Sequence, residues 1–379
     1  MRAAPCVAFR ADASLQIGTG HLMRCLTLAD ALAARGAKCQ FICREHPGNL
    51  IAFIRSKGHV VHVLPLLVHA DDAQTVAPAA DADATQPAHH HWLGATQAQD
   101  ADACAPILAE LRPDWLIVDH YALDARWEVA LKPYYHKLMA IDDLADRPHA
   151  CDLLLDQTFG RNAHEYRPWV PIDCHLCCGS QYALLRPEFA ALRPYSLQRR
   201  TEPQLRELLI TMGGVDKDNA TGEVLNALRV CVLPTECRIT VVMGTTAPWL
   251  AEIQNQAPRM PWPTQVLVGV SNMAQLMADS DLAIGAAGAT SWERCCLGLP
   301  TVMMAIADNQ TYAARLLEEA KAVCVLDIHG NLANALTTLL QKVDRSDEFL
   351  KRLTEGACKI TDGKGVQRIA DRLFTGVAT

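Results

Sequence analysis

Short apolar runs rich in strand-forming residues alternate with helical patterns along this chain, and the alternation occurs twice. The runs are CVAFR, KCQFIC, WLIVD and LMAID, then LRELLITMGG, RITVVMG, TQVLVG, LAIGAAG, TVMMAI and AVCVLD. Helical patterns follow them at 25–35, 50–57 and 126–134, then at 219–229, 249–256, 273–277, 290–297, 311–320 and 332–343. Strands that alternate with helices build parallel sheets covered on both faces. The predicted fold class is therefore α/β, with two doubly wound, Rossmann-like domains.

Two irregular stretches interrupt this pattern. Prolines and charges cluster at 192–204, which predicts a linker between domains at 1–197 and 205–379, with the last helix as a candidate to return to the first domain. Residues 69–100 are rich in Ala, Asp, Gln and Pro and include three histidines at 89–91, so they are interpreted as an inserted surface loop with incidental histidines. Ligand sites are expected at the carboxyl ends of the strands, in a cleft between the domains.

Composition excludes several classes of partner. The formal charge is −7, and no lysine-rich run or long apolar stretch is present, so neither nucleic acid nor a membrane is expected as a partner. Charged residues near the start interrupt any signal peptide, which favours a cytoplasmic protein. The fifteen cysteines are scattered, and they are expected to be reduced and buried, including Cys174 and Cys177 of the single CxxC. The oligomeric state is not indicated.

The loop IGTGH, before the helical pattern of the first domain, contains the first candidate residues. Gly18 and Gly20 free the backbone, His21 stands at the helix amino end, and Arg24 follows one turn later. A helix amino end favours neutral histidine, which can accept a proton as a general base. A dinucleotide site is disfavoured because the third glycine and a ribose-binding acid are missing. The remaining alternative is that His21 only caps the helix.

The second domain offers glycines after two of its strands. Gly213 and Gly214 follow LLIT and either admit an oxygen-rich ligand or form a plain tight turn. In GAAGATSWERCC, Gly288 precedes a helix start at which backbone amides favour an anion. Glu293 faces the same region and suits two ribose hydroxyls, although it could simply stabilise the first helical turn.

Acidic residues at other strand ends extend the candidate set. Asp12 follows the first strand, and Asp119 lies in IVDHY beside His120 and Tyr121. Asp142 and Asp143 are adjacent, so they are interpreted as loop hydrogen-bonding groups rather than a glycosidase pair. Asp119 and Tyr121 are the better candidates for ligand contact, and His120 serves either contact or packing. No metalloprotease, Walker, serine-hydrolase or EF-hand pattern occurs, and no metal or other cofactor is predicted.

Five segments together resemble a known family: FRADASLQIGTGHLMRCLTLADAL, IDDLADRPHACDLLLDQ, YALLRPEF, ITMGGVDKDNATGEVLNAL and GAAGATSWERCCLGLPTVMMAIADNQ. They are similar to the UDP-sugar hydrolases of pseudaminic acid biosynthesis, which cleave UDP-2,4-diacetamido-2,4,6-trideoxy-β-L-altropyranose. The match spans almost the whole chain except residues 69–100. The family is similar in turn to the GT-B glycosyltransferase that adds N-acetylglucosamine to the peptidoglycan lipid precursor.

The resemblance implies a GT-B architecture, a UDP-sugar substrate and UDP as a product. His21 would activate water for inverting attack at the anomeric carbon, without a metal. The substrate-binding residues it implies are Gly18, Gly20, Arg24, Asp12, Asp119, Tyr121, Asn309 and Gln310, with Asp119 supporting Tyr121. The UDP-binding residues it implies are Gly213, Gly214, Met273, Gly288, Ala289, Thr290, Ser291 and Glu293. The alternatives are a GT-B glycosyltransferase with a UDP-sugar donor and a non-catalytic nucleotide-sugar sensor.

Overall fold

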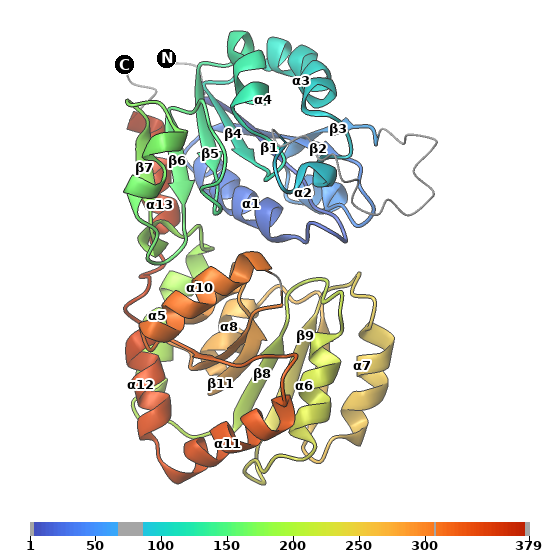
Figure 1. Cartoon of the computed structure of the whole chain (residues 1–379), viewed down its shortest axis with the longest axis vertical. Helices are drawn as coiled ribbons and strands as arrows, with labels where there is room; N and C mark the ends of the chain where they lie inside the picture. Colours follow the sequence, from blue (N-terminus) through green and yellow to red (C-terminus); the bar gives the residue numbers. More distant parts are fainter. Residues whose placement is uncertain (1–3, 67–85, 307, 376–379) are drawn as a thin grey trace. The chain divides into compact units, whose positions relative to one another are not determined.

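The computed structural model describes residues 4–66, 86–306 and 308–375, without the side chains of residues 308, 309, 344 and 345. The chain divides into two compact units (Figure 1). Unit 1 consists of Met1–Gln157, Arg161–Tyr182 and Val366–Thr379, and unit 2 of Thr158–Gly160 and Ala183–Gly365. The last helix, α13 (Gly365–Thr375), therefore belongs to unit 1 apart from its first residue.

The described residues of unit 1 form one seven-stranded parallel sheet in the order β3-β2-β1-β4-β5-β6-β7. The order reverses between β1 and β4, where Ala11 pairs with Asp119. The strands are β1 (Cys6–Ala11), β2 (Lys38–Arg44), β3 (Val60–Leu64), β4 (Trp115–Asp119), β5 (Lys137–Ile141), β6 (Leu153–Asp156) and β7 (His175–Cys178). In addition to α13, the α-helices of the unit are α1 (Gly20–Ala33), α2 (Ile51–Ser56), α3 (Gln97–Leu111) and α4 (Ala125–Ala130), and a 3₁₀ turn, η1, lies at His90–Leu93.

Apolar residues pack on both faces of this sheet. Ala8, Leu116 and Val118 contribute to a buried cluster with side chains of α3 and α4. Phe9 and Phe41 stack together, with ring centroids 4.9 Å apart. All of β4 is buried, as expected for a parallel strand between two helical layers. Helix α13 is joined to the unit through the Trp115 indole N–H, which donates to the carbonyl of Leu373 at 3.1 Å.

The described residues of unit 2 form a six-stranded parallel sheet in the order β10-β9-β8-β11-β12-β13. Its order reverses between β8 and β11. The strands are β8 (Glu207–Thr211), β9 (Arg238–Met243), β10 (Thr264–Val268), β11 (Leu282–Ala286), β12 (Thr301–Met304) and β13 (Cys324–Val325). The helices are α5 (Pro187–Arg199), α6 (Ala220–Leu228), α7 (Leu250–Gln256), α8 (Met273–Asp279), α9 (Thr290–Cys296), α10 (Asp308–Glu319), α11 (Leu332–Arg345) and α12 (Glu348–Ala357).

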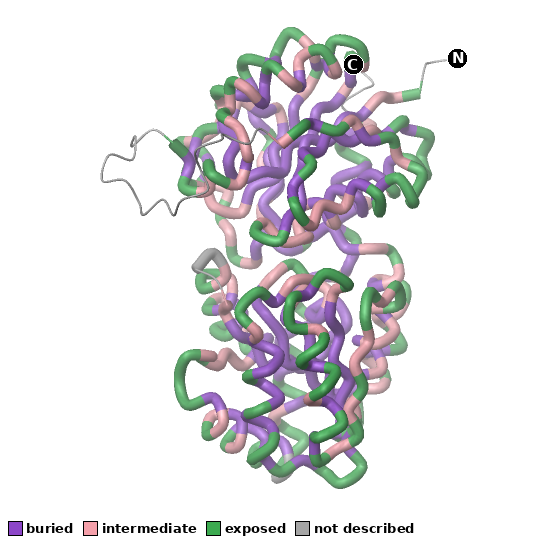
Figure 2. The backbone as a smooth tube through the Cα atoms, turned by 90° about the vertical axis from the view of Figure 1, so that its right-hand side faces the viewer, coloured by how far each residue is buried: buried purple, intermediate pink, exposed green. Residues whose placement is uncertain are grey.

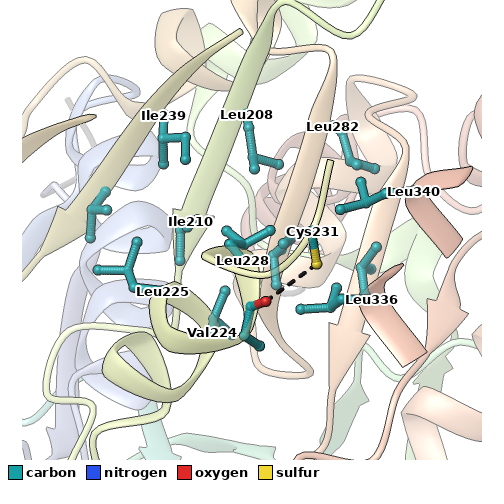
Figure 3. Close-up of a cluster of buried hydrophobic side chains, with 14 of the residues drawn as sticks. Leu208, Ile210, Val224, Leu225, Leu228, Cys231, Ile239, Leu282, Leu336 and Leu340 are labelled. Carbon is teal, nitrogen blue, oxygen red and sulfur yellow. Dashed lines mark hydrogen bonds between the residues drawn. The ribbon is translucent and has the colours of Figure 1, made fainter. Parts of the chain in front are cut away.

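Alternate residues of the unit 2 strands face two separate apolar clusters. Leu208 and Leu282 pack with α6 and α11, and Figure 3 shows Leu225 and Leu336 in that cluster. Leu209 and its neighbours on the opposite face pack with α8 and α9. Figure 2 shows the central strands of both units as mostly buried. The predicted fold class, α/β with two doubly wound parallel sheets, is confirmed.

The predicted linker at 192–204 is wrong for most of its length, because α5 runs through residue 199. Pro187 stands at the first helical position, where its fixed φ favours a helix and its missing N–H has no cost. The charged residues are partly buried in unit 2: Arg200 donates to the carbonyls of Met277 and Ser280 at 3.0 and 2.8 Å. The chain enters unit 2 at Ala183, before the predicted boundary.

The predicted surface loop at 69–100 is wrong for its last residues, because α3 begins at Gln97. Residues 69–85 lie outside the described part, whereas residues 86–100 include η1 and the start of α3. Thr96 opens α3 with a capping box to Gln99. Asp100 is fully buried and accepts hydrogen bonds from Arg10 and Arg44. Composition could not reveal this ion cluster, because its arginines lie on β1 and β2, 90 and 56 positions from Asp100 in the sequence.

The fifteen cysteines all lie in the described part and are free thiols. Cys174 and Cys177 of the CxxC are both buried. Among the described residues, no helix has the length and apolar character that crossing a membrane requires.

Candidate active site

Two loops of unit 1 meet where its strand order reverses, one after β1 and one after β4. Ligands of open parallel sheets bind at the carboxyl ends of the strands near such a reversal. Gly18 has a φ of +79°, and its N–H donates to the Ser14 carbonyl at 2.9 Å, which turns the chain before α1. Gly20 then begins α1, and a side chain there would point into open space. This geometry places His21 near the end of β4.

The His21 ring is held by a buried carboxylate. Its Nδ1 lies 2.6 Å from Oδ1 of Asp119, whose side chain has no exposed surface. Because a carboxylate only accepts hydrogen bonds, Nδ1 of the ring carries a hydrogen and donates it to Asp119. In the neutral ring, Nε2 then has a free lone pair that can take up a proton. The residue before α1 is Thr19, and no side chain caps the helix. The capping alternative for His21 is therefore wrong, and the ring is oriented by a residue 98 positions away.

Arg24 holds the same carboxylate from the other side. Its Nε donates to Oδ2 of Asp119 at 2.6 Å, and its Nη1 donates to Asp143 at 2.6 Å. Burial opposes ionisation of Asp119, but the charge of Arg24 and the hydrogen bonds from Arg24 and His21 outweigh it and hold the pKa of Asp119 well below its usual range. Asp119 is therefore a fixed anion behind His21. Arg24, predicted as a substrate ligand, is buried and bound to these two carboxylates.

Tyr121 lies against His21 but is supported by a different residue from the one predicted. Its ring meets the His21 ring edge-on, with centroids 4.5 Å apart. Its hydroxyl donates to Asp143 at 3.0 Å, so the prediction that Asp119 supports it is wrong. Asp143, interpreted from the sequence as a loop hydrogen-bonding group, accepts hydrogen bonds from Tyr121 and Arg24 within this cluster. Asp142 has the predicted loop role, since it accepts from the N–H of Ala145 at 2.9 Å.

Asp12 lies deeper than a ligand contact would require. Its side chain has no exposed surface and is 2.7 Å from Arg10, and it accepts from the N–H of Arg44 at 2.6 Å. His120 is also buried, with Nε2 3.4 Å from Asp12 and Nδ1 accepting from a backbone N–H. Both residues therefore lie beneath the loops, and their interactions are with the protein itself.

The corresponding reversal in unit 2 lies between β8 and β11, and the predicted UDP-binding glycines follow these strands. Gly213 has a φ of +96°, which a glycine adopts without strain. The carbonyl of Gly214 packs directly against Gly244. Gly288 differs from Gly213, because its φ is not positive and a side chain there would meet no atom within 4 Å. The fold of the protein itself therefore supplies no reason for glycine at position 288.

A buried arginine lies behind the loop at 288–291, and sequence reasoning missed it. Arg294 donates to the Ala286 carbonyl at 2.7 Å, to Thr290 Oγ1 at 3.2 Å and to Ser291 Oγ at 3.3 Å. Burial lowers the pKa of Arg294 to about 10. Because the guanidinium donates to both hydroxyl oxygens, the hydroxyl hydrogens remain available for another acceptor. The signal available in the sequence was the position of Arg294, a charged residue directly before the apolar run CCLGLP.

Glu293 remains accessible, with 16% of its side chain exposed. It lies 3.6 Å from Arg186, and it is also an acidic residue in the first turn of α9, so neither predicted role is eliminated. Burial raises the pKa of Glu293, and Arg186 opposes this rise. Of the other predicted ligands in unit 2, Ala289 is exposed beside Thr290, Met273 begins α8, and Gln310 accepts from the Ile306 N–H at 3.0 Å. The Asn309 side chain lies outside the described residues.

Among the described residues, no group of three or more His, Cys, Asp or Glu side chains is arranged to hold a metal ion.

Comparison with known proteins places this geometry in a fold family. Residues 223–373 match the glycosyltransferase family 28 C-terminal domain. The structure is similar to that of MurG from Acinetobacter baumannii, with a TM-score of 0.69 and 15% identity over 98% of this chain and 99% of that one. The chain has the GT-B fold. The structure is also similar to that of UDP-GlcNAc 2-epimerase from Neisseria meningitidis bound to UDP-GlcNAc, with a TM-score of 0.56 and 11% identity over 98% of this chain and 100% of that one.

One relative of this GT-B protein carries the name that the sequence resemblance suggested. It is the UDP-2,4-diacetamido-2,4,6-trideoxy-beta-L-altropyranose hydrolase of Campylobacter jejuni. The two sequences are 24% identical over 279 residues, which are 73% of this chain and 83% of the relative.

Proposed function

We propose that this protein hydrolyses a UDP-linked sugar, with UDP-2,4-diacetamido-2,4,6-trideoxy-β-L-altropyranose as the substrate, in pseudaminic acid biosynthesis. The observation that carries the proposal is the 2.6 Å contact between His21 Nδ1 and the buried Asp119. It orients the ring and leaves Nε2 as a base, which is the geometry required to deprotonate water. The name of the Campylobacter relative supports the choice of reaction and substrate.

In the proposed reaction, Nε2 of His21 takes a proton from water as the water oxygen bonds to the anomeric carbon. The bond between that carbon and the diphosphate oxygen breaks, and UDP leaves with the electron pair. Attack opposite the leaving group inverts the anomeric configuration. Asp119 stabilises the imidazolium that forms, because its carboxylate is ionised and already bound to the ring. Gly18, Gly20 and Tyr121 are proposed to contact the sugar.

The leaving group is proposed to bind in unit 2. Gly288 leaves backbone accessible, and the Thr290 and Ser291 hydroxyls accept from the buried Arg294 cation and can donate to a diphosphate. Positive charge and oriented donors around a phosphate stabilise its departure. Glu293 is proposed to accept the ribose hydroxyls, and Gly213, Gly214, Ala289 and Met273 to line the nucleotide. Gln310 and Asn309 are proposed to meet the sugar or the phosphates.

The direct test is UDP release from UDP-2,4-diacetamido-2,4,6-trideoxy-β-L-altropyranose by the purified protein, in EDTA and without an acceptor. We expect multiple turnovers, with the initially formed free sugar inverted at the anomeric carbon when the reaction is followed by NMR. The family 28 match and the similarity to MurG favour a second function, transfer of the sugar to an acceptor. Release that begins only when an acceptor is supplied would establish transfer, and absence of any UDP release would refute both functions.

Gly288→Ala tests the proposed nucleotide site. A methyl group at position 288 meets no protein atom within 4 Å, so the free energy of unfolding should change by less than about 0.5 kcal/mol. The same methyl would stand between the backbone and the diphosphate, and we expect UDP to bind at least about tenfold more weakly by titration calorimetry. Gly330→Ala is the matched control, since a Cβ there makes only ordinary contacts with Asp327. Equal UDP affinity in both variants would exclude position 288 from the site.

A further inference from the structure

Three aromatic side chains pack together beside the His21 ring, and two of them come from the segment that the sequence analysis interpreted as an inserted surface loop. The ring centroids of His89 and Trp92 are 4.4 Å apart. Both rings also contact Tyr121: the Trp92 ring stacks on it at 5.8 Å, and the His89 ring lies at 5.4 Å. The Trp92 ring meets His21 edge-on at 6.5 Å. We call His89, Trp92 and Tyr121 the aromatic wall.

The fold holds this segment firmly. Leu93 is 1% exposed and packs in the core cluster with Leu64 and Cys104. Gly94 has a φ of +67°, and a side chain there would overlap His46 and Leu66, so the turn after η1 packs tightly. The buried Asp100 then fixes the start of α3. The wall is therefore positioned in the free protein, and no conformational change is needed to form it.

The wall offers ring surface beside the candidate base rather than additional charge. Tyr121 is 5% exposed and donates its hydroxyl to Asp143, whereas His89 and Trp92 are only partly buried. Burial and the neighbouring His91 lower the pKa of His89, which favours its neutral ring. Aromatic surface of this kind pairs with C–H groups and methyl groups, and a ligand that covers it removes apolar area from water.

We propose that His89 and Trp92 bind the apolar substituents of the sugar beside His21, and that they select acetamido, 6-deoxy hexoses over fully hydroxylated ones. The inference rests on the proposed function, because it takes the sugar of the UDP-sugar to be the group at His21. Methyl groups at C6 and on the acetamido groups present the C–H surface that the rings favour. A hexose with hydroxyl groups at these positions would lose hydrogen bonds to water against the rings. His89 and Trp92 are thus assigned as specificity-determining residues.

The test compares Trp92→Ala and His89→Ala with His90→Ala, an exposed histidine in the same 3₁₀ turn. For Trp92→Ala we expect KM for the diacetamido substrate to rise about tenfold, with kcat less affected and UDP affinity unchanged. We expect a smaller change of the same kind for His89→Ala. The preference for the diacetamido substrate over UDP-glucose, whose sugar carries only hydroxyl groups at these positions, should fall about tenfold in Trp92→Ala. His90→Ala should retain the wild-type KM and kcat.

The outcomes separate this inference from the proposed function. If the wild-type protein releases no UDP, the proposed function fails. Calorimetry with the intact UDP-sugar and with UDP then tests whether the aromatic wall binds the sugar. Weaker binding of the UDP-sugar but not of UDP to Trp92→Ala would support the wall. Unchanged KM and unchanged sugar preference in Trp92→Ala would overturn it, as would an equal loss of UDP and UDP-sugar affinity. Thermal unfolding of each variant identifies any loss that comes from misfolding.

Discussion

His21→Asn is expected to lower the rate of UDP release by about 100-fold or more while UDP still binds, because the variant has no base. An asparagine amide can still donate to Asp119, so the buried carboxylate keeps a partner, but nothing replaces the Nε2 nitrogen. The measurement is the initial rate of UDP release at saturating substrate, with UDP affinity determined by calorimetry. His21→Ala should lose activity to a similar degree.

A matched control for this substitution is His136→Asn, which changes an exposed histidine in the same unit. Its rate should equal that of the wild-type protein. Full activity in His21→Asn would contradict the assignment of the base. Loss of UDP binding together with activity would indicate a role for His21 in holding the nucleotide.

Asp100→Ala is expected to lower the free energy of unfolding of unit 1 by about 3–5 kcal/mol, the usual effect of removing one partner of a buried ion pair. The Asp100 carboxylate accepts from Arg10 at 3.1 and 2.7 Å, from Arg44 at 2.7 Å and from the Trp127 indole at 3.0 Å. Without it, two buried guanidinium groups lose a counterion. Thermal or urea unfolding measures the loss, and Asp102→Ala, an exposed position on the same helix, is the control.

The stabilisation by Asp100 should also depend on pH. Burial raises the pKa of Asp100, but Arg10 and Arg44 outweigh it, and the pKa lies below its ordinary value. A group with a depressed folded-state pKa stabilises the protein fully above its unfolded pKa of about 3.9, and the contribution is lost as the pH falls through the folded value. The difference in the free energy of unfolding between wild type and Asp100→Ala should therefore be largest at pH 7 and should decrease below about pH 4. A difference under about 1 kcal/mol at pH 7 would contradict the assigned role of Asp100.

Sequence reasoning predicted the fold from local pattern because parallel strands covered on both faces are apolar along their length. The runs CVAFR, WLIVD, LLIT and LAI correspond to β1, β4, β8 and β11, the four strands at the two reversals of strand order. The loops after them contain nearly all the candidate residues. The linker and the insertion were mispredicted because prolines and charges resemble loops when their partners are unknown. Directly after α5, Arg200 donates to backbone carbonyls of unit 2. In α3, Asp100 accepts from two arginines.

The sequence by itself determined which loops could form a site, because glycine positions and strand ends are local properties. Only the tertiary structure decided which side chains work together. His21 is joined to Asp119 across 98 positions, Arg24 to Asp143 across 119 and Arg10 to Asp100 across 90. The aromatic wall likewise joins Trp92 to Tyr121 from two separate loops. These pairings follow from the order of strands in the sheet, which brings distant loops to one edge and which no local pattern encodes.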